Sequence, residues 1–117
     1  MLTSATARYL RISPRKVRAV LRLIQGLEVP KAEAVLDHTN KGATKVVRRL
    51  LKTAVASAAQ KAHVTSEELR ISRAVADGGP MLKRHRAAPM GRAMVIRKRT
   101  CHLHIELDSR PLVKGKI

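Results

Sequence analysis

The sequence predicts an α+β fold, in which three helices pack on a small three-stranded antiparallel sheet and a long β-hairpin protrudes. Three observations predict it. Apolar residues recur at helical spacing in the first half of the chain, apolar and polar residues alternate in two later segments, and a stretch rich in Lys and Arg separates those segments. At 117 residues, a single domain is expected.

The N-terminal part predicts a strand followed by a helix. Residues 2–12 hold small, β-compatible side chains and give a weak signal for a strand or an extended arm. Ser13 is a good N-cap, Pro14 suits the first helical position, and Gly26 can take the left-handed conformation that ends a helix. The apolar face of this helix consists of Val17, Val20, Leu21 and Ile24.

Two further helices are predicted before residue 63. The second begins at Pro30 and spans about two turns, with Ala32, Val35 and Leu36 on its apolar face. The third covers roughly residues 41–62 and is capped by Thr39 or Asn40. Its predicted core stripe consists of Ala43, Val46, Val47, Leu50, Ala54 and Ala58. A basic arc on the opposite side consists of Lys41, Lys45, Arg48, Arg49 and Lys52.

Alternation with a period of two predicts a pair of strands in the second half. In the first strand, Leu69, Ile71 and Val75 face one way, and Arg70, Ser72 and Ala74 face the other. In the second strand, the inward set is Cys101, Leu103, Ile105 and Leu107, and the outward set is His102, His104, Glu106 and Asp108. The two strands can pair in an antiparallel sheet.

Residues 76–100 connect these strands and have no periodic apolar face. Because a structureless loop of this length is unusual in a compact domain, we expect the strands to continue outward as a hairpin with its tip near residues 85–90. This arm reaches about 50–60 Å from residue 69 to the tip. The predicted domain covers residues 1–110, with a body (1–75 and 101–110), an arm (76–100) and, beyond it, a flexible tail (111–117).

The charge distribution indicates a polyanionic partner. The chain has 25 Lys and Arg against 8 Asp and Glu, a net charge of +17, and residues 1–27 and 78–105 contain no acid. Solvated faces usually mix both signs. Since Tyr9 is the single aromatic residue, modules that stack several bases are excluded, and if the partner is a nucleic acid, backbone charge and shape must carry the binding. The predicted phosphate-binding residues are Arg8, Arg11, Arg15, Lys16, Arg18, Arg22, Lys41, Lys45, Arg48, Arg49, Lys52, Lys83, Arg84, Arg86, Arg92, Arg97, Lys98 and Arg99.

Other classes of function are disfavoured. Cys101 is the only cysteine, so neither a disulfide within the chain nor a thiolate zinc cluster is expected. His102, His104 and Glu106 are a weak metal candidate, because residues two apart on a flat strand rarely converge on one ion. We expect no catalytic residues, no cofactor, no metal and no membrane span, in a protein of the cytoplasm. A free-standing basic DNA-binding protein is the alternative.

Five segments show a resemblance to a known family. These are residues 12–18 (ISPRKVR), 52–58 (KTAVASA), 79–84 (GPMLKR), 91–93 (GRA) and 96–102 (IRKRTCH). Together, with their spacing, they resemble the family of the bacterial twenty-second large-subunit ribosomal protein, which has a long β-hairpin in the exit tunnel. The resemblance covers almost the whole chain.

The resemblance implies a structural constituent of the large ribosomal subunit. It implies that the protein binds and joins ribosomal RNA domains, contacts neighbouring ribosomal proteins, and lines the nascent-peptide exit tunnel with its hairpin tip. The nascent peptide and macrolide antibiotics are then expected near that tip. The implied tip residues are Lys83, Arg84, His85, Arg86, Ala88, Pro89, Met90 and Gly91.

Overall fold

The computed structural model describes residues 3–87 and 89–109. A three-stranded antiparallel sheet has the strand order β1-β5-β2, and β3 pairs with β4 in a separate two-stranded ribbon. The predicted α+β fold is therefore confirmed. In chain order the elements are β1 (Thr3–Leu10), α1 (Pro14–Ile24), α2 (Val29–His38), α3 (Thr44–Ala62), β2 (Leu69–Gly78), β3 (Leu82–Ala87), β4 (Ala93–Lys98) and β5 (Cys101–Ser109), with short 3-10 turns at Ser66–Glu68 and Pro89–Gly91.

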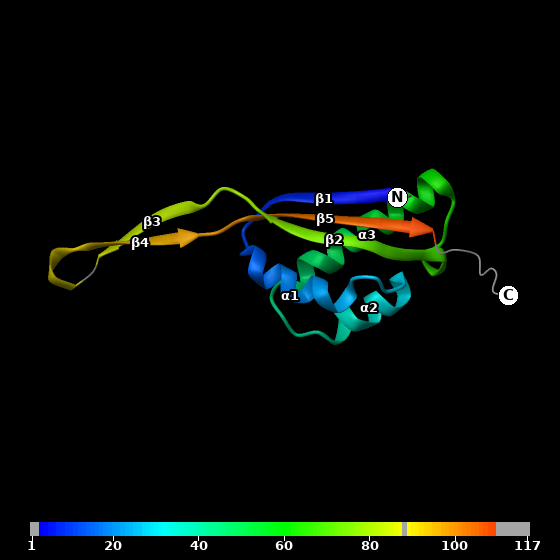
Figure 1. The fold of residues 1–117 in the computed structure, drawn as a ribbon, viewed down its shortest axis with the longest axis horizontal. Coiled ribbons are helices and arrows are strands. Elements are labelled where there is room, and N and C mark those ends of the chain that lie inside the picture. The colour runs from blue at the N-terminus through cyan, green and yellow to red at the C-terminus, as the bar shows by residue number, and fades with distance from the viewer. Residues whose placement is uncertain (1–2, 88, 110–117) are drawn as a thin grey trace.

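The molecule has a body and a protruding arm (Figure 1). The helices cover one face of the three-stranded sheet, while β3 and β4 run outward from the end of the sheet at which β2 stops and β5 begins. The long axis measures 71 Å, against 26 and 18 Å for the other two. None of the helices in the described part of the chain has the length and apolarity to cross a membrane.

The core lies between the sheet and the helices. Strand β5 alternates strictly, with its four inward side chains fully buried, as predicted. Helix α1 contributes the four apolar residues that the sequence predicts, and all four are buried. Cys101 packs inward with no exposed surface. Burial raises the pKa of its thiol, and the nearby positive charge of Arg18 opposes that shift in part.

Local signals set the ends of α1. The Oγ of Ser13 accepts a hydrogen bond from the backbone N–H of Lys16 at 3.4 Å, and Gly26 has a φ of +81° just past the helix. The amide of Gly26 donates to the carbonyl of Ile71 at 3.1 Å, and the amide of Ile71 donates to Leu27 at 2.9 Å. The end of α1 is thereby attached to the outer edge of β2.

Helices α2 and α3 differ from prediction at their starts. Helix α2 spans 10 residues, longer than predicted, because it begins at Val29, with Pro30 in the second position, and continues past Leu36 to His38. Helix α3 begins at Thr44 instead of residue 41, with Ala43 as its N-cap, so neither Thr39 nor Asn40 caps it. Its core stripe is wider than predicted, since five of the six predicted residues are buried and Leu51 joins them. Leu51 is fully buried, whereas Val46 is only partly buried, because the helix packs on both β1 and β5.

The predicted facing of β2 is wrong beyond Ile71. The pairing with β5 shifts by one residue between Ile71 and Arg73, so a β-bulge inverts the alternation. Ala74 and Ala76 are therefore buried, and Val75 is turned to the outer face. Small side chains consequently line the core where the strand approaches the helices.

The hairpin is interrupted where it leaves the body. Pairing of β2 with β5 ends at Gly78 and Cys101, and pairing of β3 with β4 starts at Leu82 and Lys98. The body strand thus extends beyond residue 75, the predicted boundary. Ala88 of the predicted tip and the predicted tail, residues 111–117, lie outside the described residues.

Candidate nucleic-acid interface

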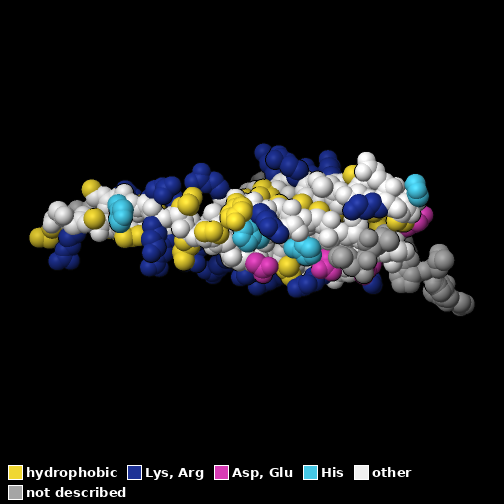
Figure 2. Space-filling model, turned by 90° about the horizontal axis from the view of Figure 1, so that it is seen from above, with side chains coloured by type: hydrophobic (Ala, Val, Ile, Leu, Met, Phe, Trp, Pro, Cys, Tyr) yellow, Lys and Arg dark blue, Asp and Glu magenta, His cyan; other side chains and the backbone are white. Residues whose placement is uncertain are grey.

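The arm is the most uniformly basic part of the molecule. In the view of Figure 2, Lys and Arg side chains stand out on both sides of the arm, and acidic side chains are seen only over the body. The register places Lys83 directly opposite Arg97 on one face, and pairs Arg84 with Ile96 and Arg86 with Met94 on the other. Like charges placed directly opposite each other destabilise a ribbon, so this one needs a counter-anion.

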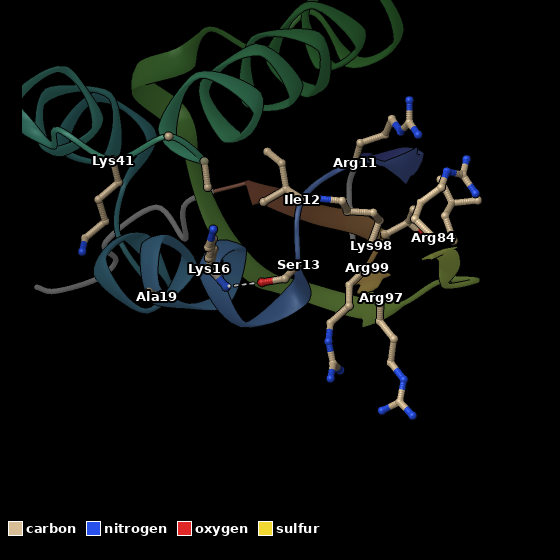
Figure 3. A pocket seen from close by; sticks show the side chains of 14 residues that line it. Arg11, Ile12, Ser13, Lys16, Ala19, Lys41, Arg84, Arg97, Lys98 and Arg99 are labelled. Atoms are coloured by element: carbon tan, nitrogen blue, oxygen red, sulfur yellow. Dashed lines mark hydrogen bonds between the residues drawn. The ribbon is translucent and has the colours of Figure 1, made fainter. Parts of the chain in front are cut away.

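A hollow lies where the arm meets the body (Figure 3). Its volume is ≈ 1130 Å³. The apolar residues Ile12, Ala19, Ala43 and Leu82 form part of its lining, and none of the described acids lines it. Seven cationic residues within the described part of the chain line it: Arg11, Lys16 and Lys41 from the body, and Arg84, Arg97, Lys98 and Arg99 from the arm and its base.

The start of α1 adds to the positive potential of this hollow. Ser13 lines the hollow and caps the helix, and the first turn of the helix carries no acid. The first amide groups of a helix and the helix dipole favour negative charge nearby. Lys16, in that same turn, contributes a full charge. Backbone and side chains therefore attract anions to the same place.

Most other predicted phosphate-binding residues are exposed but lie apart from the hollow. On α3, Lys45, Arg49 and Lys52 remain exposed, whereas Lys41 lies in the loop before that helix. The predicted basic arc is therefore shorter on the helix than expected. The other exposed cations of the predicted set that lie outside the hollow and α3, and that bond to no other element, are Arg8, Arg15, Arg22, Lys83, Arg86 and Arg92.

Two predicted phosphate-binding residues, Arg18 and Arg48, bond to other elements of the protein, while Nη1 of Arg84 donates to the carbonyl oxygen of its neighbour Lys83 at 3.0 Å. The Nε and Nη2 atoms of Arg18 donate to the carbonyl oxygen of Ala76 at 3.0 and 2.8 Å. Nη2 of Arg48 donates to the carbonyl oxygen of Leu36 at 3.1 Å and forms an ion pair with Asp37 at 3.0 Å. Arg18 therefore helps to hold α1 on β2, and Arg48 helps to hold α3 on α2.

The residues of the predicted tip do not lie together. Pro89, Met90 and Gly91 form the turn, and Met90 is 95% exposed. Lys83 and Arg84 lie at the inner end of the ribbon. The sequence analysis missed the exposed apolar side chains of the arm, which are Met81, Met94 and Val95. The sequence did contain a signal for these exposed side chains: large apolar residues occur in residues 78–100, a segment that contains no acid and has no periodic apolar face.

The outward side chains of β5 bond to the protein itself. Nδ1 of His104 lies 2.7 Å from Oγ1 of Thr6, and Nε2 of His104 lies 3.0 Å from Oε2 of Glu106. Glu106 also pairs with Arg73 at 3.5 Å. Within residues 3–87 and 89–109, no cluster of three or more His, Cys, Asp or Glu could hold a metal ion.

Comparison with known proteins gives consistent matches over most of the chain. The family model described as ribosomal protein L22p/L17e matches residues 5–108. The large ribosomal subunit protein uL22 of Halothermothrix orenii is 42% identical over 110 residues, which cover 94% of this chain and 97% of the relative. The uL22 proteins of Thermoanaerobacter sp. (strain X514) and Thermoanaerobacter pseudethanolicus are each 47% identical over 110 residues, covering 94% of this chain and 99% of each relative.

Proposed function

The chain belongs to the ribosomal protein L22p/L17e family, and we propose that its basic hollow, its arm and the exposed cations of α1 and α3 bind ribosomal RNA. As a member of this family, it is a structural constituent of the large ribosomal subunit, with ribosomal RNA and ribosomal proteins as its partners. The comparisons give no support to the alternative of a free-standing DNA-binding protein.

One observation carries the proposal for RNA. Among the described residues, seven cations from the body and the arm line one hollow, and no acid lines it. Phosphodiester groups are the anions that such a surface fits, because a polyanion releases counter-ions when several of its phosphates are neutralised at once. Since the chain offers one aromatic side chain, Tyr9, the contacts are made mainly to the RNA backbone, and arginine planes add some stacking on bases.

The salt dependence of binding tests this mechanism. If about ten phosphates are neutralised, log affinity for large-subunit ribosomal RNA falls with log salt at a slope of roughly −7, the value for single strands. A slope shallower than about −2 would contradict backbone binding by this surface. Co-sedimentation adds a second test: the protein should stay on large subunits through a high-salt wash, and a DNA-bound pool with none on ribosomes would revive the alternative.

The turn of the arm is proposed to line the nascent-peptide exit tunnel. In support, Pro89, Met90 and Gly91 form a compact turn at the end of the molecule that is farthest from the body. Met90 offers an exposed apolar contact there, of a kind that a passing peptide or a macrolide antibiotic can use. Residues elsewhere on the arm, such as Arg86, then contact RNA on the way to the tunnel.

Shortening the arm tests the tunnel proposal. Deletion of residues 81–84 removes half of β3 and leaves its partners on β4 unpaired, which displaces the turn, and none of the deleted residues is buried. We expect the variant to fold and to enter large subunits, while the sensitivity of the cells to macrolides changes. Unchanged sensitivity in ribosomes that contain the variant would contradict a tip that lies near the drug. Loss of incorporation would show that this segment is needed for assembly.

A further inference from the structure

The direction of the arm is weakly determined by contacts inside the protein. Strands β3 and β4 pack against each other, and within the described elements neither packs extensively on a helix or on the three-stranded sheet. At the base, the amide of Gly79 donates to the carbonyl of Thr100 at 3.0 Å, and Oγ1 of Thr100 donates to the carbonyl of Pro80 at 2.6 Å. These bonds join the two sides of the hairpin to each other. They do not tie the hairpin to the helices.

The hollow is the place where arm and body face each other across a gap. Its body side carries the cations of Arg11, Lys16 and Lys41, and its arm side carries four more. In Figure 3, the guanidinium ends of Arg97 and Arg99 point one way and those of Arg11 and Arg84 point another, so the cations do not all face a single point. Without an anion, the two sides repel each other.

We propose that the hollow is a two-sided phosphate clamp, in which consecutive phosphodiester groups of one RNA strand bridge the body and the arm and thereby fix the direction of the arm. This inference rests on the proposed binding of ribosomal RNA. An anion between the two sides replaces their repulsion with attraction, and the effect is strongest within the Debye length of about 8 Å at physiological salt. The arm is then positioned by RNA at its base, before its turn meets any partner.

The dimensions and lining of the hollow favour a polymer strand over a small anion. Its volume of ≈ 1130 Å³ exceeds the range of about 300–1,000 Å³ that is usual for small-molecule sites. Seven cations also provide for several phosphates in sequence. The apolar part of the lining, which includes Ile12 and Leu82, gives riboses and base edges a surface to contact beside the charged groups. A single phosphate ion would leave most of these groups unused.

The test compares pairs of variants that remove the same charge. The arm-side pair is Arg97→Gln with Arg99→Gln, and the body-side pair is Arg11→Gln with Lys16→Gln, both lining the hollow. Their control, Arg86→Gln with Arg92→Gln, removes two arginines from the arm outside the hollow. Each double variant retains a net charge of +15, since the chain starts at +17 and loses two. All six side chains are exposed, so the fold is expected to persist.

The direction of the arm is measured by pulsed electron–electron double resonance. Nitroxide labels are placed on Gln60→Cys in α3 and on Ala93→Cys in β4, which are exposed positions, while the native Cys101 is buried and escapes labelling. For the labelled full-length chain, the distance distribution should be broad without RNA and should narrow when protein-free large-subunit ribosomal RNA is added. Inorganic phosphate alone should not narrow it.

The outcomes separate this inference from the proposed function. We expect each double variant of the hollow to bind the RNA about tenfold more weakly and to keep a broad distance distribution when RNA is added. The double variant of Arg86 and Arg92 should lose some affinity, but RNA should still narrow its distance distribution. The clamp would be overturned, while RNA binding stands, if RNA narrowed the distance distribution of both double variants of the hollow. It would also be overturned if all three double variants lost the narrowing equally. Narrowing by phosphate alone would also overturn it. An unaltered chain that fails to bind the RNA would overturn the proposed function itself.

Discussion

Gly79 and Thr100 face each other so closely at the base of the arm that a Cβ added to Gly79 would lie 2.6 Å from Oγ1 of Thr100. Thr100 is 93% buried, since its exposed fraction is 7%, and its hydroxyl group is held by the carbonyl oxygen of Pro80. The threonine therefore has little room to turn away. Between the last pair of the sheet and the first pair of the ribbon, one side of the hairpin has three residues, 79–81, and the other has two, 99–100. The close approach of Gly79 and Thr100 accommodates this difference.

Gly79→Ala should therefore destabilise the protein. The added methyl group must displace Thr100 or break its hydrogen bond, and overpacking of this kind costs about 1–3 kcal/mol in the free energy of unfolding. Urea unfolding followed by circular dichroism measures the change. Gly78→Ala is the matched control, because a Cβ there meets nothing within 4 Å, and we expect a change within about 0.5 kcal/mol. Equal effects of both substitutions would refute the role given to this contact.

Arg18→Gln should weaken the fold more than it weakens RNA binding. The substitution removes both donors to the carbonyl of Ala76, at a cost of about 1–2 kcal/mol in the free energy of unfolding. Arg22→Gln, one turn further along α1, removes the same charge from an exposed position and should stay within about 0.5 kcal/mol. If the two variants unfold at the same urea concentration, the bond to Ala76 contributes nothing measurable.

The Cys101 thiol should be protected and should make stability fall at alkaline pH. Burial raises its pKa in the folded state above the ordinary value of 9.0, so the unfolded chain loses this proton first. The free energy of unfolding therefore falls as pH rises above that value, until the folded thiol also ionises. In Cys101→Ala this part of the decline in stability should be absent. Comparison of the two proteins therefore separates the effect of the thiol from that of the lysines and the tyrosine. Rapid reaction of native protein with a thiol reagent would contradict the buried position.

The body should fold without the arm. None of the described residues from 81 to 99 is buried, so replacing residues 82–98 with an Asn-Gly turn removes no core side chain. We expect the free energy of unfolding to change by no more than about 1 kcal/mol, mainly through the shorter loop. Calorimetry of this variant beside the full chain provides the measurement. If the variant without the arm unfolds at a much lower temperature than the full chain, the ribbon stabilises the body through contacts that bury no side chain.

Much of the fold could be read from short-range patterns. The ends of α1 depend on Ser13, Pro14 and Gly26, which act on backbone groups within a turn of themselves. The alternation of β5 holds because each of its side chains faces either the helices or the outer surface, with no irregularity within the strand. The absence of acids from residues 78–105 can be read from the sequence without any structure. These features persist because their causes lie within a few residues along the chain.

Other features were decided by partners that lie far away in the sequence. The bulge after Ile71 arises from the pairing of β2 with β5, and the acceptor of Arg18 lies 58 residues further along the chain. The hollow exists because the segment before α1, the loop before α3 and the base of the arm converge. The sequence alone determined which residues are charged and which local elements form. Only tertiary packing decided which charges are used inside the protein and which face one another across open space, because pairing and burial depend on neighbours that no local pattern specifies.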